Sequence, residues 1–162
     1  MRWIWIDRFE EFESGVRAVA VKNVSLAEDH LHDHFPGYPI MPHSLMVEGM
    51  AQTAGVLVGE ARNFAEKVIL AKIKRAVFHS VVKPGETIHH EARIEQLTDQ
   101  GASTTGRITV GDTLVGEVDI FFSHIDQNVS GLEFPEENFV FTESFISLLN
   151  AYRFGAGKRI AL

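Results

Sequence analysis

Cysteine is absent from the 162 residues of this chain. Its absence excludes disulfide bonds, thiolate zinc sites and cysteine nucleophiles, and it fits a reducing compartment. Long apolar runs are also missing. The opening run from Trp3 to Ile6 is too short for the core of a signal peptide and is followed at once by Asp7. No window approaches the ~20 apolar residues of a membrane span. The sequence therefore favours a soluble protein of the cytoplasm.

Positive charge is in short supply. The chain has 15 Lys and Arg against 22 Asp and Glu, for a net charge of −7. Nonspecific nucleic-acid binding relies on Lys and Arg to neutralise phosphates, so no nucleic-acid partner is expected. Hydrophobic residues make up 45% of the chain, enough for a packed core. The length fits a single domain.

Periodicity predicts one long helix among several strands. The apolar residues of 44–62 lie on nearly every side of a helix, which predicts a helix buried all round. The prolines and glycine of 30–42 predict an ordered loop. Residues 84–86 and 110–113 are expected turns. The expected strands are residues 3–7, 15–24, 68–82, 87–97, 103–110 and 114–123. This order predicts an α+β domain whose sheet wraps around the helix.

Two further features concern packing and domain limits. Each glycine destabilises a helix by ~1 kcal/mol, so Gly49, Gly55 and Gly59 predict a close approach of helix to sheet. A domain over residues 1–132 is expected, followed by a C-terminal extension over 133–162. Within the extension, a short helix at 143–152 is expected to pack on the domain or on a neighbouring subunit.

Glu48 is an acid in the most apolar segment of the chain. Burying a lone carboxylate is costly, so such a group finds a partner or becomes neutral. Glu48 does not fit the position of a capping-box acid. Its four-residue spacing from Ser44 and to Gln52 leaves two interpretations open. One is a solvated polar stripe, and the other is a functional acid whose orientation Gln52 holds.

His34 lies in the loop just before the helix. A lone loop histidine is more often a surface residue than a catalyst. The hypothesis of a base therefore rests on its combination with Glu48 and with the helix N-terminus between them. The first N–H groups of a helix have no internal acceptor and can stabilise negative charge on a thioester oxygen. This combination suits the removal of a proton beside a carbonyl group.

A resemblance to a known family lies in residues 34–55, which read HFPGYPIMPHSLMVEGMAQTAG. This segment resembles the signature of the 3-hydroxyacyl-acyl carrier protein dehydratases of fatty-acid synthesis. AVKNVS at 20–25 and VKPGE at 82–86 are also similar to that family, and the similarity spans about residues 15–124. The resemblance implies a hotdog fold, with a long central helix wrapped by a curved antiparallel sheet. It also implies a homodimer, alone or as a trimer of dimers, with active sites at the subunit interface.

The resemblance further implies roles for particular residues. His34 would be the base and Glu48, from the other subunit, the acid. Substrate contacts would lie at Gly37, His43, Ser44 and Gln52. The substrate would be carried by acyl carrier protein or by coenzyme A. No metal or redox cofactor would be needed, because dehydration moves protons without changing oxidation state.

Two stretches depart from the family pattern. His43 stands where the family has a glycine whose backbone N–H binds the thioester carbonyl. Positive φ would be unfavourable for a histidine there, and its ring could narrow the site, but we expect the ring to turn aside. Residues 78–81, FHSV, replace basic residues and a proline, which weakens the expected docking site for an acidic carrier. Three other basic residues could compensate for this loss of positive charge: Lys72, Lys74 and Arg75.

Other patterns indicate chemistry less strongly. Three loop histidines have spacings that could supply metal ligands, but without a closing motif they are better explained as ordinary polar residues: His30, His32 and His34. His89 and His90 are adjacent on an expected strand and point to opposite faces. Ser44 is a better candidate for the helix N-cap than for a nucleophile.

Three functions remain in competition. The leading hypothesis is dehydration of a (3R)-3-hydroxyacyl-carrier thioester to a trans-2-enoyl thioester and water. The alternative enzyme is a hotdog acyl thioesterase, in which Glu48 would activate water and His34 would be dispensable. The third is a noncatalytic acyl-binding or scaffold protein, which His43 and the altered docking stretch make plausible. The presence of both His34 and Glu48 within the motif favours dehydration.

Overall fold

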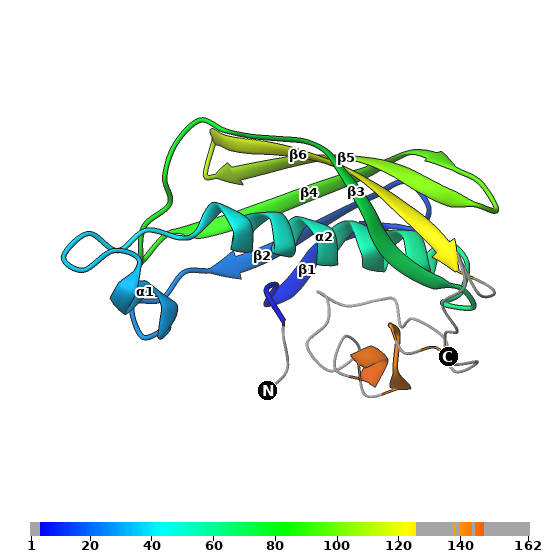
Figure 1. Cartoon of the computed structure of the whole chain (residues 1–162), viewed down its shortest axis with the longest axis horizontal. Helices are drawn as coiled ribbons and strands as arrows, with labels where there is room; N and C mark the ends of the chain where they lie inside the picture. The colour runs from blue at the N-terminus through cyan, green and yellow to red at the C-terminus, as the bar shows by residue number, and fades with distance from the viewer. Residues whose placement is uncertain (1–3, 126–137, 139, 144, 148–162) are drawn as a thin grey trace.

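The computed structural model describes residues 4–125, 138, 140–143 and 145–147. Strands and one long helix make up most of this part of the chain (Figure 1). The strands are β1 (Arg8–Glu13), β2 (Arg17–Asn23), β3 (Lys67–Phe78), β4 (Thr87–Leu97), β5 (Gly101–Val110) and β6 (Thr113–Ile125). The two helices with defined bounds are α1 (His30–Asp33) and α2 (His43–Glu60).

The strands form one antiparallel sheet in the order β1-β2-β4-β5-β6-β3. Helix α2 lies along one face of this sheet and contacts every strand from β2 to β6 (Figure 1). The arrangement confirms the predicted α+β class and the hotdog fold. It also leaves β3 at one edge of the sheet and β1 at the other.

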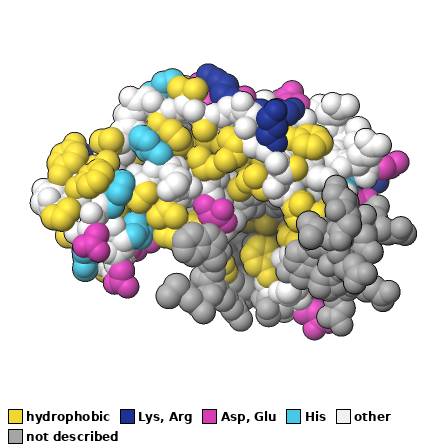
Figure 2. All heavy atoms as spheres, viewed as in Figure 1, with side chains coloured by type: hydrophobic (Ala, Val, Ile, Leu, Met, Phe, Trp, Pro, Cys, Tyr) yellow, Lys and Arg dark blue, Asp and Glu magenta, His cyan; other side chains and the backbone are white. Residues whose placement is uncertain are grey.

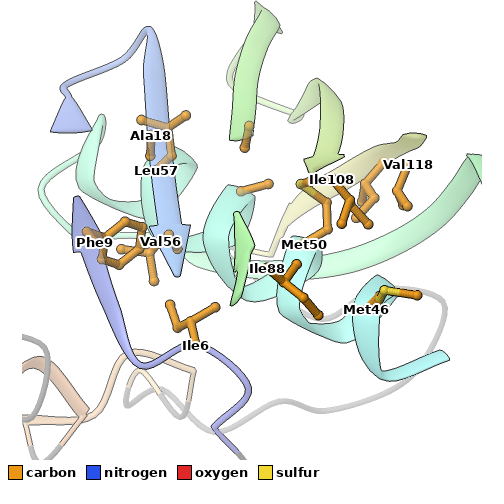
Figure 3. Packing of buried hydrophobic residues seen from close by; sticks show 14 of the residues in the cluster. Ile6, Phe9, Ala18, Met46, Met50, Val56, Leu57, Ile88, Ile108 and Val118 are labelled. Carbon is orange, nitrogen blue, oxygen red and sulfur yellow. The ribbon is translucent and has the colours of Figure 1, made fainter. Parts of the chain in front are cut away.

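Apolar side chains fill the space between α2 and the sheet. Met46 and Met50 of α2 belong to the same buried cluster as Ile88 of β4 and Ile108 of β5 (Figure 3). Each of these four side chains is at most 1% exposed. Complete burial stabilises such a side chain by about 1.5–3 kcal/mol. The cluster therefore fixes α2 on the sheet and, with it, the side chains on the other side of the helix.

The prediction about helix glycines is confirmed at one position. A Cβ atom on Gly49 would lie 2.6 Å from Nε2 of His90, so only glycine allows α2 to approach β4 this closely. At Gly55 the nearest atom is 3.5 Å away, an ordinary contact. Gly59 also faces a close neighbour, but that neighbour is Phe141 of the C-terminal segment rather than the sheet.

Three predicted elements need correction in the first half of the chain. Residues 4–7 are not a strand, because the first strand begins at Arg8. The loop predicted over 30–42 contains the one-turn helix α1. Helix α2 is not buried all round: His43 and Ser44 are exposed, and Glu48 and Gln52 are half-buried.

Element ends also shift by a few residues. Helix α2 ends at Glu60 rather than 62, because Asn63 and Phe64 take positive φ and the Phe64 N–H bonds to the Gly59 carbonyl at 2.7 Å. Strand β3 ends at Phe78 rather than 82. The carbonyl of Val82 instead accepts a hydrogen bond from the Met41 N–H, which ties this segment to the loop before α2.

The C-terminal extension is described only in part. The predicted helix over 143–152 lies mostly outside the described residues, as does the boundary predicted at 132–133. Asn138 donates hydrogen bonds to the carbonyls of Phe64 and Glu66, and the rings of Phe141 and Phe64 lie 4.9 Å apart. No helix in the described ranges is both long and apolar enough to cross a membrane.

Candidate active site

The loop between α1 and α2 positions His34. Its Nδ1 lies 3.0 Å from the carbonyl oxygen of Ile40, and the His34 carbonyl accepts a hydrogen bond from the Ile40 N–H at 2.9 Å. A carbonyl oxygen can only accept, so Nδ1 must carry the proton in this contact. The neutral imidazole therefore keeps its lone pair on Nε2. We call His34 and the loop that holds it, residues 34–42, the base arm.

A tight turn shapes the base arm. Phe35 and Tyr38 exchange two backbone hydrogen bonds, and Gly37 between them has φ +75°. Gly37 therefore serves the turn, because other residues rarely adopt this conformation. The side chains of Phe35 and Tyr38 are 53% and 52% exposed. Figure 2 shows hydrophobic and histidine side chains gathered over the end of the molecule that carries α1.

Helix α2 positions Glu48 one turn into the helix. The amide of Gln52 donates a hydrogen bond of 2.8 Å to Glu48 Oε1. The oxygen of the same amide accepts a hydrogen bond of 2.8 Å from the backbone N–H of Trp5. The predicted hydrogen bond between Gln52 and Glu48 is thus present, and both side chains are half-buried. We call Glu48 and Gln52 with the segment at Trp5 the acid arm.

The start of α2 carries His43. It is the first helical residue, after Pro42, and its φ is not positive, so the strain expected for a histidine here does not arise. Its ring stacks on Phe78 at the end of β3, with centroids 4.2 Å apart and an angle of 6°. Ser44 is exposed and is the second residue of the helix, whose N-cap is Pro42, so the prediction that Ser44 is the N-cap is wrong.

His34 and Glu48 have different hydrogen-bond partners within one chain. In the described residues no hydrogen bond or ion pair joins His34 to Glu48; the former bonds to Ile40 and the latter to Gln52. Residues 4–125 thus bring together Glu48 with Gln52, and separately His43 with Phe78. For both side chains to act on one substrate, either the substrate must lie between His34 and Glu48 of one chain, or a second chain must supply one of them.

His90 is a buried histidine behind the acid arm. Its side chain is completely buried on β4, against Gly49, and its ring nitrogens have no hydrogen-bond partner within the described part of the chain. Desolvation, with a smaller effect from neighbouring His89, lowers the pKa of His90 to about 3. His90 is therefore neutral at physiological pH and acts in packing. The alternation of His89 and His90 agrees with the sequence analysis.

Metal binding has no support among the residues that the structure describes. No three His, Asp or Glu side chains there converge on a common point. His32 Nε2 lies 3.1 Å from the carbonyl of Leu26, whereas the ring of His30 packs edge-on against Trp5. The histidines at 30, 32 and 34 thus have separate surroundings.

Basic side chains lie along the exposed strand β3. Arg75 is paired with Glu117 at 2.9 Å, which raises the pKa of the arginine through that hydrogen bond and lowers the pKa of the glutamate. The ammonium group of Lys74 lies 2.8 Å from the hydroxyl of Ser103. Arg75 is therefore already paired within the sheet, and Lys74 is hydrogen-bonded to Ser103.

Sequence analysis missed Trp5. Nothing in the local pattern around Trp5 indicates a link to the helix, because its partner Gln52 is 47 residues away. Its aromatic ring also contacts Lys22 and His30. Only the folded chain brings these groups together.

Comparisons with known proteins show which family the chain resembles. The model of the FabA-like domain matches residues 3–119. The chain is 39% identical over 125 residues to the 3-hydroxyacyl-[acyl-carrier-protein] dehydratase FabZ of Chloroflexus aggregans, covering 76% of this chain and 87% of the relative. It is 37% identical over 122 residues to the FabZ of Pelotomaculum thermopropionicum, covering 75% and 87%.

Solved structures with the same fold are more distant in sequence. The dehydratase heterocomplex ApeI:P from Xenorhabdus doucetiae matches with a TM-score of 0.57 at 18% identity, covering 70% of this chain and 92% of that chain. The uncharacterized protein PH1136 from Pyrococcus horikoshii matches with a TM-score of 0.62 at 15% identity, covering 79% and 89%. These matches support the fold.

Proposed function

The chain belongs to the FabA-like family of 3-hydroxyacyl-acyl carrier protein dehydratases, and we propose from this premise that His34 and Glu48 carry out its reaction. The reaction converts a (3R)-3-hydroxyacyl thioester to a trans-2-enoyl thioester and water, as a step of fatty-acid biosynthesis. The observation that carries the assignment of roles is the contact between His34 Nδ1 and the Ile40 carbonyl, because it leaves Nε2 as the proton acceptor.

The base arm removes the proton from C2 of the substrate. As the C2–H bond breaks, negative charge develops on the thioester oxygen. The N–H of His43, at the start of α2, has no acceptor within the helix and can donate to that oxygen. The stacking of the His43 ring on Phe78 supports this, since it holds the ring to one side of the backbone donor.

The acid arm completes the elimination. The C3–O bond breaks, and the departing hydroxyl takes a proton from the neutral carboxyl group of Glu48 to leave as water. Glu48 Oε1 accepts the hydrogen bond from Gln52, so Oε2 is the oxygen that carries this proton. After product release the proton on His34 returns to Glu48 through solvent, which restores both groups.

A dimer would bring the two arms to one substrate. Strand β3, at the edge of the sheet, is 12 residues long and exposes Leu70 (41%) and Ile73 (43%). Long apolar edges are usually covered in native proteins, because unpaired strands aggregate. No hydrogen bond or ion pair joins His34 to Glu48 in the described part of one chain, which gives further support to a homodimer. The homodimer would stand alone or within a trimer of dimers, with His34 and Glu48 of each site from different chains.

A product-resolved assay tests the proposed function. The purified protein is incubated with 3-hydroxyacyl thioesters of acyl carrier protein and of coenzyme A, and the enoyl product is separated from free thiol. We expect enoyl product without thiol release, and a faster reaction on the carrier-protein thioester. Release of free thiol would identify a thioesterase. Binding without either product would identify an acyl-binding protein.

A further inference from the structure

We propose that Trp5 is a positioning residue for the acid Glu48, acting through the side-chain amide of Gln52. The inference rests on the proposed function of Glu48. It adds to the candidate active site a segment that precedes the first strand and lies far from the motif in sequence. Its basis is a continuous pair of hydrogen bonds, from the Trp5 N–H to Gln52 Oε1 and from Gln52 Nε2 to Glu48 Oε1, each 2.8 Å long.

The Trp5 hydrogen bond determines which way the Gln52 amide faces. A backbone N–H can only donate, so the group that faces Trp5 must be the amide oxygen. The amide nitrogen must then face Glu48. Without Trp5 the amide could rotate by half a turn and present its oxygen to the acid. An ionised Glu48 would then be repelled, and a neutral one would donate its proton to Gln52 instead of to the substrate.

The backbone that follows Trp5 is held in place. Two residues later, the Asp7 N–H bonds to the Val21 carbonyl at 2.7 Å. The carboxylate of Asp7 accepts hydrogen bonds from the backbone and the side chain of Asn23, at 2.7 and 3.0 Å. Ile6, between Trp5 and Asp7, is 7% exposed. The segment is thus fixed on β2, although it is not itself a strand.

The ring of Trp5 is held by a separate set of contacts. The ammonium group of Lys22 lies 5.9 Å from the ring centroid and is bound to Glu28 at 2.6 Å. The ring of His30 meets Trp5 edge-on, with centroids 5.2 Å apart. Lys22 is only 8% exposed, so its charge acts on the ring with little solvent screening. A smaller side chain would lose these contacts and let the donor move.

A matched pair of variants separates the hydrogen bond from the ring. Trp5→Ala and Trp5→Pro both remove the ring, but only proline also removes the N–H donor. Errors in the placement of a catalytic group of about 1 Å reduce rates by up to about a hundredfold. We expect kcat to fall about tenfold in Trp5→Ala and further in Trp5→Pro, with KM little changed in both. Trp5→Phe, which keeps an aromatic ring and the donor, should retain most of the activity.

A double-mutant cycle shows whether Trp5 acts through Gln52. Gln52→Leu removes the amide, so adding Trp5→Ala to it should cause no further loss of kcat. Additive losses, or wild-type kcat in Trp5→Pro, would overturn the proposal. The exposed Arg8→Ala variant, three residues away, serves as a control and should keep wild-type kcat.

Hydrogen exchange tests the same contact without relying on activity. The Trp5 amide proton should exchange slowly in the wild-type protein and quickly in Gln52→Leu. Equal exchange in the two folded proteins would overturn the proposal even if the enzyme is active. If the wild-type protein forms no enoyl product, the proposed function fails, whereas the exchange result still decides whether Trp5 holds Gln52. This measurement also applies if Trp5→Ala does not fold.

Discussion

The base arm and the acid arm are held in place by contacts of different range along the chain. His34 bonds to Ile40, six residues away, through the backbone of its own loop. Glu48 bonds to Gln52, whose orientation depends on Trp5, 47 residues away. The hydrogen bond that orients His34 is therefore local, although the hydrogen bond between Met41 and Val82 ties the same loop to the segment after β3. The hydrogen bonds that orient Glu48 depend on how the N-terminal segment packs on the finished sheet.

This difference has a consequence for robustness. A local turn such as that at Gly37 keeps its shape as long as its own residues are unchanged. The acid arm also depends on Gly49, where α2 approaches β4 so closely that any side chain would collide with His90. Changes far from Glu48 should therefore disturb the acid arm more readily than the base arm.

Removal of the base should give the largest effect. We expect His34→Ala to lower kcat by roughly 10²–10⁴-fold, because general-base catalysis contributes about that much. The fold should stay intact, because the half-buried ring bonds to its own loop and stacks on exposed Phe35. Steady-state kinetics on a 3-hydroxyacyl thioester, together with circular dichroism, measure this. Near-wild-type turnover in the folded variant would eliminate His34 as the base and favour a thioesterase.

Removal of the acidic proton should be the next largest effect. Glu48→Gln keeps the shape of the side chain and can still accept the hydrogen bond from Gln52, but it has no proton to give to the departing hydroxyl. We expect about a hundredfold loss of kcat, within the range of general-acid contributions, with the dimer preserved. If the variant unfolds while its folded fraction remains fully active, Glu48 is structural.

Lowering the pH should destabilise the packing of His90 behind the acid arm. The pKa of His90 is about 3 in the folded protein and ~6.5 in the unfolded chain, so the unfolded chain binds the proton first as pH falls. The contribution of neutral His90 to the free energy of unfolding is thus complete above pH ~6.5. It is lost towards pH 3, at up to about 1.4 kcal/mol per pH unit.

The His90→Leu variant isolates this contribution. Carboxylates such as Glu91, whose pKa the hydrogen bond from Arg17 lowers, also lose stability in acid, so the two proteins must be compared at each pH. Denaturant unfolding at pH 7, 6 and 5 and at one protein concentration gives the difference. We expect the free energy of unfolding to fall more steeply in the wild-type protein. Parallel curves would show that His90 is not the group that titrates.

The His43 ring should have the smallest effect. We expect His43→Gly to change turnover by less than about tenfold, or ~1.4 kcal/mol in the barrier, because the ring stacks on Phe78 and the backbone donor remains. The variant should mainly broaden the range of acyl chains accepted. Specificity constants for a series of 3-hydroxyacyl thioesters measure this. Activity that appears only in His43→Gly would show that the histidine blocks the site.

The sequence predicted much of the fold because most elements have a strong local pattern. Strand β4 has the predicted bounds, and α2 begins one residue earlier than predicted. The error at residues 3–7 arose because a short run of apolar residues is shared by strands and by extended segments. The N–H of Trp5 in fact bonds to a side chain of the helix.

The candidate site was predictable only in its local parts. His34, Glu48 and Gln52 could be selected because they lie inside one specific motif, within a span of 19 residues. Trp5 and the packing of His90 on Gly49 could not, because these contacts depend on the register of β4 and on the path of the N-terminus in three dimensions.

Mixing two inactive variants tests most directly whether the two arms from different chains form one site. His34→Ala and Glu48→Gln should each have little activity alone, but if the proposed dimer forms, each mixed dimer should contain one site with both groups intact. After complete random exchange between two-fold symmetric dimers, half of the dimers are mixed and one of their two sites is intact, so activity should recover to about a quarter of the wild-type value. Enoyl product is measured before and after exchange, and mixed dimers are verified by mass spectrometry. Recovery near that value is the predicted result, whereas no recovery after verified exchange would contradict an active site shared between the base arm of one chain and the acid arm of the other.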